Sequence, residues 1–168
     1  KAYELLVEYY SGSRILSYAQ NRDVNFWRDP PYWTCISATL EDDNGKVIAS
    51  YTKNKLSLFT YSPSVDCKIS LEELQPHLFS DPDRPNSTCF YFRNQYRHWK
   101  PEWGFSIPHK IREGLSSKSS YQVKIDTDFN YKKKMIQSDY HHQGASDKIF
   151  LFVGHFDHPA QVNDGLSG

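Results

Sequence analysis

The chain has 168 residues, a length that suits one domain or a domain and a half. Hydrophobic residues make up 38% of it and aromatic residues 15%, which is enough for a packed core and excludes a disordered segment. Its 20 basic and 20 acidic residues cancel, so bulk charge does not favour nucleic acid or an anionic membrane surface as a partner.

The first 33 residues predict a short helical region followed by an irregular entry into a sheet. Residues from Tyr3 to about Tyr10 combine closely spaced apolar side chains with two glutamates, which indicates a short amphipathic helix that ends at the "SGS" of residues 11–13. The following "RILSYAQ" indicates a further turn or two of helix. The two adjacent prolines in "FWRDPPYW" (residues 26–33) argue against regular structure there, because proline removes a backbone donor and restricts the residue before it.

Residues 32–66 predict a small antiparallel sheet. Two alternating segments flank the "DDNG" of residues 42–45, and Asn44-Gly45 suits a hairpin turn with positive φ at both central residues. The segment "KLSLFTYS" (residues 55–62) alternates again and is expected to add a strand. The heavy supply of aromatic residues also favours strands.

The middle of the chain predicts two short helices around a loop and an aromatic segment. Ser70 is a plausible N-cap with Glu73 three residues later, and Pro76 ends that turn. A polar loop at residues 80–87 follows, and residues 89–107 carry aromatics too dense for a solvated loop. "PHKIREGL" indicates a short helix that stops at Gly114.

The last third predicts three strands. "YQVKIDTDF" (residues 121–129) alternates as a half-buried strand, and "MIQSDYHH" is expected to return antiparallel to it. "KIFLFVGHF" (residues 148–156) is apolar on both faces, which indicates a central strand covered on both sides.

A histidine–aspartate cluster follows this last strand. His155 and Asp157 are two residues apart, so in extended backbone they point to the same side, and Asp164 lies in the "NDGLSG" turn. One imidazole can bind a metal while the neighbouring carboxylate orients it, and a second carboxylate can bridge two cations. The same residues also fit a hydrogen-bonded structural loop, and the residues alone leave both readings open. The adjacent pair at His141 and His142 is expected to be solvent-exposed.

The arrangement of a strand followed by H-x-D and then N-D-x-x-S-G resembles the first half of the metal site in the co-catalytic di-zinc aminopeptidases. It is most similar to a bacterial subfamily of aminopeptidase-like proteins that carry an inserted domain and often accompany polysaccharide biosynthesis. The subfamily loop commonly reads H-x-C-H-P-(S)-x-x-N-D-x-L-S-G, and this chain has "HFDHPAQVNDGLSG" at residues 155–168. The matching residues are His155, His158, Pro159, Asn163, Asp164, Leu166, Ser167 and Gly168.

Upstream motifs resemble the same subfamily in the same order. They are the W-x-x-P-x-x-W of Trp27, Pro30 and Trp33, "YSPSVDCKISLEELQPHL", "WGFSIPHKIREGL" and "YQVKIDTDF", and together they cover most of residues 24–168. Two positions depart from the pattern. Asp157 stands where the subfamily often has Cys, which restores the H-x-D of the broader group, and Ser106 also replaces a usual Cys.

The resemblance implies an α/β fold, seen as α+β over these residues. Residues 1–23 would be an N-terminal helical segment of the peptidase domain, residues 24–118 an inserted antiparallel β-rich subdomain, and residues 119–168 the first strands of a mixed sheet typical of zinc aminopeptidases. The resemblance also places a general-base Glu and further metal ligands downstream of Gly168, so this chain is expected to hold at most half of a site.

For the complete protein, the resemblance implies a di-zinc hydrolase that cleaves a peptide or related amide bond. His155 and Asp164 would bind metal, Asp157 would orient His155 as a catalytic acid, and His158 is the alternative ligand. Trp103 and His109 of the insert would contact substrate. Two alternatives remain: a non-catalytic peptidase-like module whose aromatic insert binds a glycan or a protein, and an inactive fragment.

Location and assembly follow from weaker signals. Three widely spaced cysteines without a CxxC pair argue against a disulfide framework and fit a reducing cytoplasm. No stretch approaches the ~20 apolar residues of a membrane span, so no membrane partner is expected. A homo-oligomer is possible, because residues 149–153 would expose an apolar strand if nothing covered them.

Overall fold

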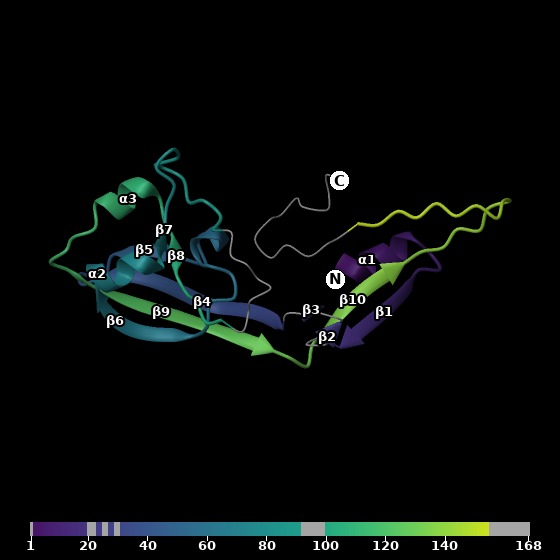
Figure 1. The fold of residues 1–168 in the computed structure, drawn as a ribbon, viewed down its shortest axis with the longest axis horizontal. Helices are drawn as coiled ribbons and strands as arrows, with labels where there is room; N and C mark the ends of the chain where they lie inside the picture. The colour runs from purple at the N-terminus through teal and green to yellow at the C-terminus, as the bar shows by residue number, and fades with distance from the viewer. Residues whose placement is uncertain (1, 20–22, 25–26, 29–30, 92–99, 155–168) are drawn as a thin grey trace. The chain divides into compact units, whose positions relative to one another are not determined.

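A computed structural model describes residues 2–19, 23–24, 27–28, 31–91 and 100–154. The chain divides into two compact units, one from residues 1–19 and 134–168 and one from residues 20–133. Figure 1 shows the elements of both units. The second unit starts near the expected insert boundary at residue 24 but extends past residue 118 to include a long further strand.

The centre of the second unit is a four-stranded antiparallel sheet in the order β5-β4-β9-β6. Its strands are β4 (Tyr32–Asp42), β5 (Val47–Ser50), β6 (Val65–Ser70) and β9 (Ser120–Asn130). β9 is paired on both sides, with β4 from Tyr32↔Asn130 to Asp42↔Tyr121 and with β6 from Val65↔Ile125 to Ser70↔Ser120. The expected strand at residues 121–129 is therefore confirmed, and it lies inside the sheet.

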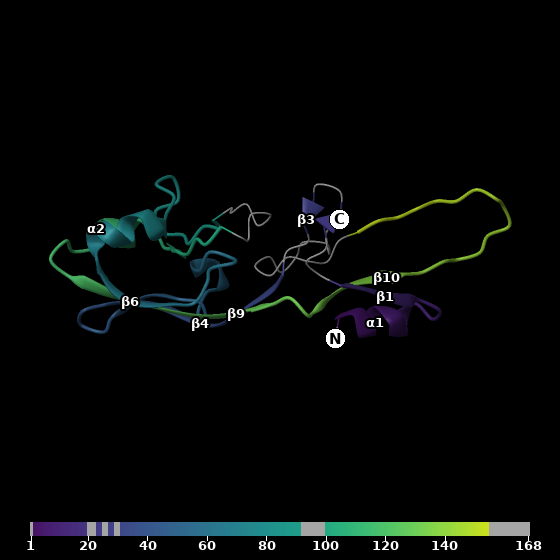
Figure 2. The ribbon, with the colours of Figure 1, turned by 60° about the horizontal axis from the view of Figure 1, so that its bottom comes forward.

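The sheet buries one face and exposes the other, as its alternating sequence requires. Tyr121, Val123 and Ile125 of β9 are buried, whereas Lys124 and Asp126, which point to the other face, are exposed. On the buried side lie α2 (Leu71–Leu74), α3 (His109–Glu113) and the short strands β7 (Leu78–Phe79) and β8 (Phe105–Ser106) (Figures 1 and 2). Leu40, Leu74, Phe105 and Val123 are fully buried at 0% exposure, so they form the centre of this core.

The hairpin between β4 and β5 is confirmed, but its turn differs from the expected one. Only Gly45 has positive φ, at 76°, while Asn44 stays in the ordinary region. The carboxylate of Asp42 accepts hydrogen bonds from the backbone N–H of Asn44 at 3.0 Å and of Lys46 at 2.9 Å. This side-chain bonding holds a longer turn, for which one left-handed residue is enough.

Two helix boundaries follow from local sequence as expected. Ser70 and Glu73 form a capping box: the Glu73 N–H donates to Ser70 Oγ at 3.3 Å, and the Ser70 N–H donates to Glu73 Oε2 at 2.9 Å. After α2 the chain continues as the 3-10 turn η2 (Gln75–His77), with Pro76 near its start. The helix α3 ends at Gly114, whose N–H donates back to the carbonyl groups of Lys110 and Ile111.

The capping box predicts a pH-dependent contribution to stability. Hydrogen bonds from the Ser70 backbone and side chain lower the pKa of Glu73 below its ordinary value of 4.5. A lowered pKa in the folded state stabilises the protein above that ordinary value, and the stabilisation is lost as pH falls through the lowered pKa. We therefore expect Glu73→Gln to lower the urea midpoint at pH 7 and the difference from wild type to shrink in acid. Glu72→Gln, on the same helix but outside the capping box, is the matched control and should lower the urea midpoint less.

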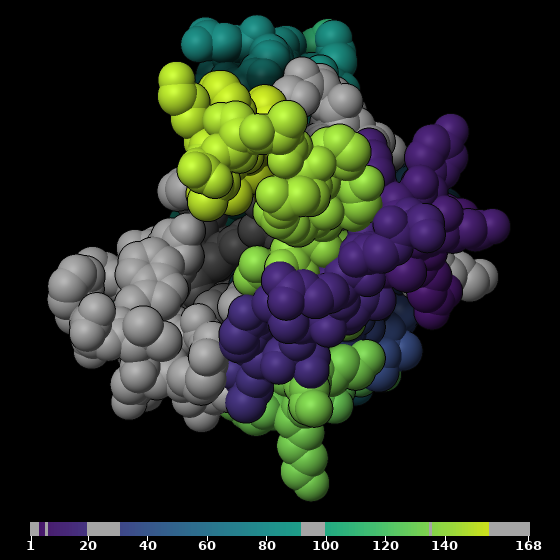
Figure 3. Space-filling view, turned by 90° about the vertical axis from the view of Figure 1, so that its right-hand side faces the viewer, coloured from purple at the N-terminus to yellow at the C-terminus, as the bar shows by residue number. Residues whose placement is uncertain are grey.

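The first unit contains α1 (Ala2–Tyr9) and an antiparallel pair of strands, β1 (Arg14–Ala19) and β10 (Lys134–Asp139). Figure 3 shows this unit from its own side, with the purple N-terminal residues against the green of β10. Arg14 and Asp139 sit opposite each other in the register and form an ion pair of 2.6 Å. The N-terminal helix is thus confirmed.

Several local expectations were wrong. "RILSYAQ" forms β1 rather than helix, and "MIQSDYHH" provides β10, which pairs with β1 rather than with the strand before it. "KLSLFTYS" begins as the 3-10 turn η1 (Lys55–Ser57) and adds no strand to the sheet, apart from one bridge between Leu58 and Phe105. Within "FWRDPPYW", β3 (Trp27–Arg28) pairs with β2 (Asp23–Val24), and β4 begins directly after Pro31.

The described part of the expected central strand at residues 148–156, residues 148–154, forms no strand, and residues 155–156 lie outside the described residues. This segment has no strand pairing, and Ile149, Phe150, Leu151, Phe152 and Val153 are 81% to 93% exposed. Its backbone groups lack a neighbouring strand among the described residues, where β1 and β10 form a two-stranded sheet of their own. His141 and His142 are exposed as expected, although in a loop.

The described elements form a mixed α+β fold in which strands predominate, which confirms the expected fold class. Among the described residues, no helix has the length and apolar character that a membrane span requires.

Candidate functional site

The predicted metal site falls outside the described residues. His155, Asp157, His158 and Asp164 belong to the part of the chain on which the structure gives no description, so their roles remain predictions. Within residues 2–19, 23–24, 27–28, 31–91 and 100–154, no group of three or more His, Cys, Asp or Glu side chains is placed to hold a metal ion. The geometry of the remaining candidates, Trp103 and His109, is defined.

A parallel pair of short strands positions both of these residues. β7 and β8 pair as Leu78↔Phe105 and Phe79↔Ser106. Each strand is only two residues long. Trp103 comes just before β8 and His109 shortly after it, which places them at opposite ends of the pair. They therefore contribute to two separate side-chain clusters.

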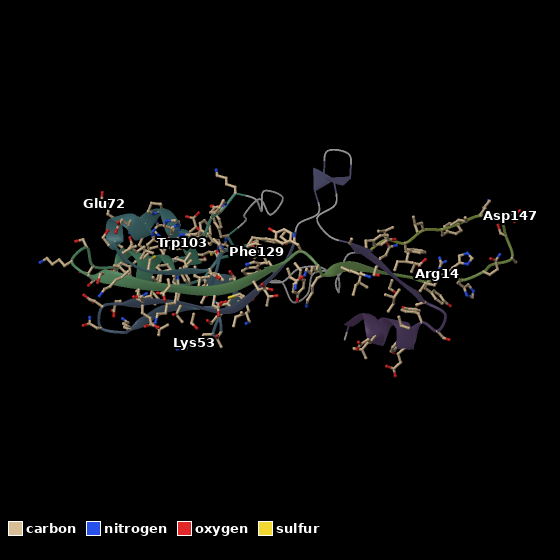
Figure 4. All side chains as sticks on the ribbon, turned by 90° about the horizontal axis from the view of Figure 1, so that it is seen from below. Arg14, Lys53, Glu72, Trp103, Phe129 and Asp147 are labelled. Carbon is tan, nitrogen blue, oxygen red and sulfur yellow. The ribbon has the colours of Figure 1, made fainter. Side chains whose placement is uncertain are left out.

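At one end, Trp103 stacks on His77. The two rings are 3.7 Å apart between centroids and only 5° from parallel, and both side chains are half-buried. His77 Nδ1 lies 2.8 Å from the backbone oxygen of Trp103, so the same residue fixes the imidazole ring by a hydrogen bond as well as by stacking. This arrangement holds an aromatic surface rigidly at the start of both strands (Figure 4, where Trp103 is labelled).

More aromatic residues lie close to the same end. Tyr91 stacks on Phe59 at 3.9 Å between centroids and contacts the Phe79 ring at 5.1 Å. Its hydroxyl donates a hydrogen bond of 3.2 Å to the carboxylate of Glu102, the second residue before Gly104. Part of the dense aromatic sequence thus packs in the core, where the Tyr91 ring contacts the rings of Phe59 and Phe79.

Gly104 is required where these elements meet. Its carbonyl accepts a hydrogen bond of 2.9 Å from the Phe59 N–H. A Cβ atom built at this position would overlap both the backbone oxygen of His77 and the ring of Phe59. Backbone and aromatic ring therefore approach so closely that only glycine fits without a shift of the chain.

We expect Gly104→Ala to destabilise the second unit by about 1–3 kcal/mol, the usual cost of overpacking a filled core. The His77–Trp103 stack should be disturbed in the same variant, because His77 supplies one of the clashing atoms. Urea unfolding and near-ultraviolet circular dichroism measure the two effects. Gly144→Ala is the matched control, since a Cβ there meets nothing within 4 Å; equal effects from both variants would contradict the close approach.

At the other end, His109 belongs to a polar cluster. Its Nδ1 atom lies 2.9 Å from Ser80 Oγ, and its Nε2 atom lies 3.7 Å from Glu113 Oε1, one helical turn later. The neighbouring Arg112 donates to Gln75 Oε1 through Nε at 3.0 Å and through Nη2 at 2.8 Å. These contacts tie α3 to the residues around β7, which gives His109 a structural role in addition to its predicted contact with substrate.

The sequence did not identify His77 or Ser80 as the partners of Trp103 and His109. The pairing depends on two strands of two residues each, which are too short to produce a periodic pattern. One signal was present: His77 lies in "LEELQPHL" and Trp103 in "WGFSIPHKIREGL", both of which are motifs of the resemblance.

Cys35 is held as a neutral thiol. Burial raises its pKa to about 11, with nearby Lys55 opposing the shift and Asp126 adding to it. Cysteine reacts and binds metal as the thiolate, so the raised pKa makes Cys35 a poor nucleophile at neutral pH. Cys35, Cys67 and Cys89 are all free thiols.

Comparison of the sequence with known families gives a match to "Domain of unknown function (DUF2172)" over residues 32–128. A protein of Clostridium acetobutylicum called "Putative polysaccharide biosynthesis protein with aminopeptidase-like domain" is 28% identical over 146 residues. That alignment covers 84% of this chain and 31% of the relative.

Comparison of the structures gives a crystal structure, also from Clostridium acetobutylicum, called a "putative peptidase". The TM-score is 0.63 at 22% identity, and the match covers 82% of this chain and 31% of the other. The fold is therefore shared over most of the chain. The chain spans 31% of the length of each of these two proteins.

Proposed function

Since this chain belongs to the DUF2172 family, we propose that it forms part of a metal-dependent aminopeptidase-like hydrolase that cleaves a peptide or related amide bond. The observation that carries the proposal is the match to a protein named for an aminopeptidase-like domain, which extends over 84% of this chain. The match covers 146 residues, more than the family's residues 32–128 contain. The similarity to this protein is therefore not limited to the sheet of the second unit.

The C-terminal sequence supplies donors that suit zinc. Imidazole nitrogen and carboxylate oxygen are both common zinc ligands, and His155 and Asp164 offer one of each. Asp157 is spaced to hold the imidazole of His155 in orientation, and His158 is the alternative ligand. When bound, a pair of zinc ions would polarise the scissile carbonyl and lower the pKa of a bound water to ~7.

The second unit would contribute to substrate selection. The His77–Trp103 stack offers a half-buried, rigid aromatic surface that can pack against a substrate side chain or ring. His109 is the second proposed contact, held through Ser80 at the other end of β7 and β8. Because the two residues lie at opposite ends, they would contact different parts of a substrate.

The same stack favours a second candidate function. A rigid aromatic pair with exposed area is also suited to binding a glycan or a protein without catalysis. In that case the chain would be a non-catalytic peptidase-like module. For either function, we also propose that the protein is cytoplasmic and forms a homo-oligomer.

The test is metal removal from the protein in its natural full length. We expect about two equivalents of zinc by atomic emission, and hydrolysis of aminoacyl-methylcoumarin amides that stops after treatment with 1,10-phenanthroline and returns when zinc is added. Its non-chelating isomer 1,7-phenanthroline is the control. A metal-free protein that binds oligosaccharides or a partner protein, with binding lost in Trp103→Ala, would support the non-catalytic module instead.

A further inference from the structure

A hollow of about 160 Å³ opens at the outer edge of the four-stranded sheet. β5 forms that edge, because it pairs only with β4. The hollow is lined by β5, by the turn at residues 53–57, by Thr88 and by the segment 106–108 that follows β8. Lys53, labelled in Figure 4, is the one charged side chain of this lining, which contains no acidic and no aromatic residue.

One backbone donor of β5 is directed away from the sheet. The N–H of Tyr51 donates to the carbonyl of Ala38 on β4. In an antiparallel ladder the direction alternates from residue to residue, so the preceding residue, Ser50, turns its N–H and C=O away from β4. In agreement with this direction, the Ser50 carbonyl accepts instead from the N–H of Asn54 at 2.9 Å. The Ser50 N–H is left on the side of the hollow.

Two lining side chains add donors beside it. The Asn54 oxygen accepts from the Leu56 N–H at 3.0 Å, which orients the amide and leaves its NH₂ group as a donor. The ammonium group of Lys53 belongs to the same turn. Donors with a positive charge and no acidic neighbour in the lining favour an anionic oxygen over a neutral or cationic group.

The other lining residues have a different character. Ser57 Oγ already donates to the Asn54 carbonyl at 2.7 Å, and Ser106 Oγ donates to the Cys89 carbonyl, so neither hydroxyl has a hydrogen left for an anion. Val47, Ile107 and Pro108 supply aliphatic surface. The volume equals about five waters at ~30 Å³ each, which limits the occupant to a small group.

We infer that this hollow binds a small aliphatic carboxylate, with the carboxylate at Ser50, Lys53 and Asn54 and the hydrocarbon part against Ile107 and Val47. Either a free acid or the C-terminus of a peptide presents this chemistry. Neither residue of the His77–Trp103 stack and none of the predicted zinc ligands is among the residues given for this lining, so the inference does not rest on the proposed hydrolase activity.

Saturation-transfer-difference NMR with the 168-residue chain tests the inference, because it detects weak ligands of about millimolar affinity. The probe is isovalerate, and isovaleramide is its uncharged counterpart of the same shape. We expect saturation of the isovalerate methyl protons with a Kd at least fivefold lower than that of the amide. Lys53→Gln should weaken isovalerate binding about tenfold, as expected for a lost hydrogen bond to a charged group. Lys68→Gln, an exposed lysine on β6 at the other edge of the sheet, should leave it unchanged.

Two peptides separate the possible sources of the carboxylate. Ac-Gly-Gly-Val with a free C-terminus should bind as well as isovalerate if the site accepts peptide ends, and its C-terminal amide should not. Binding of isovalerate but not of the peptide assigns the site to free acids. Equal binding of isovalerate and isovaleramide, no saturation at all, or an unaltered Kd in Lys53→Gln would overturn the inference.

Discussion

Asp164→Asn should reduce amide hydrolysis by the natural full-length protein by about a thousandfold or more. Asparagine keeps the shape of the side chain but loses the negative charge that would hold two cations together. Metal-ion stabilisation of transition-state charge is worth several kcal/mol, and each ~1.4 kcal/mol is a factor of ten in rate. The measurement is kcat/KM on an aminoacyl-methylcoumarin amide together with zinc content per molecule, and both should fall.

Companion variants separate the roles within the loop. If His155 is the ligand, His155→Ala loses zinc whereas His158→Ala keeps it; the reverse result would assign the alternative ligand. Asp157→Asn should cost about 10- to 100-fold, the usual effect of removing the residue that orients a metal-bound histidine. Asp147→Asn, at an exposed position, is the control. Full activity and full zinc content in Asp164→Asn would contradict the proposed role of this carboxylate.

Phe105→Ala should destabilise the 168-residue chain by about 3–5 kcal/mol, which is a large part of the stability of a domain of this size. Phe105 has no exposed area, pairs with Leu78 in the β7–β8 ladder and forms the bridge to Leu58. Truncation removes buried apolar surface and leaves a cavity beneath the sheet. Urea unfolding followed by circular dichroism measures the loss.

Phe150→Ala is the matched control for this truncation, because it deletes the same ring from a position that is 81% exposed. Its effect on the free energy of unfolding should stay within ~0.5 kcal/mol. A cost similar to that of Phe105→Ala would mean that residues 149–153 pack against apolar surface in solution. That result would restore the expectation of a covered strand.

The elements that the sequence predicted correctly are those whose signals are local. The capping box of Ser70 and Glu73, the helix stop at Gly114 and the hairpin at Gly45 each depend on a few adjacent residues. The alternation of residues 121–129 also predicted a half-buried strand, since one face of the sheet is covered and the other is exposed.

The errors arise where pairing between distant residues decides the structure. Residues 14–19 become a strand because residues 134–139, more than a hundred positions later, provide a partner. β9 lies between β4 and β6, an order that no local pattern specifies. The alternation of residues 55–62 gave no strand, because Asn54 caps a 3-10 turn there through its bond to Leu56.

The same contrast between local signals and contacts of distant residues holds for the candidate site. The resemblance suggested Trp103 and His109 as substrate contacts, but it did not predict their own contacts with His77 and Ser80, which depend on the β7–β8 pairing. The hollow beside β5 is equally invisible in the sequence, since four separate segments line it. The loop at residues 155–168 is the opposite case: the sequence alone supports its role.

Anomalous X-ray diffraction at the zinc edge, from crystals of the natural full-length protein, examines that loop directly. We expect two peaks, with a nitrogen of His155 and an oxygen of Asp164 at about 2.0–2.2 Å from the metal. Crystals grown with excess zinc that show no peak beside these side chains, with the imidazole and both acids turned apart, would leave an aromatic-rich β module without hydrolase chemistry.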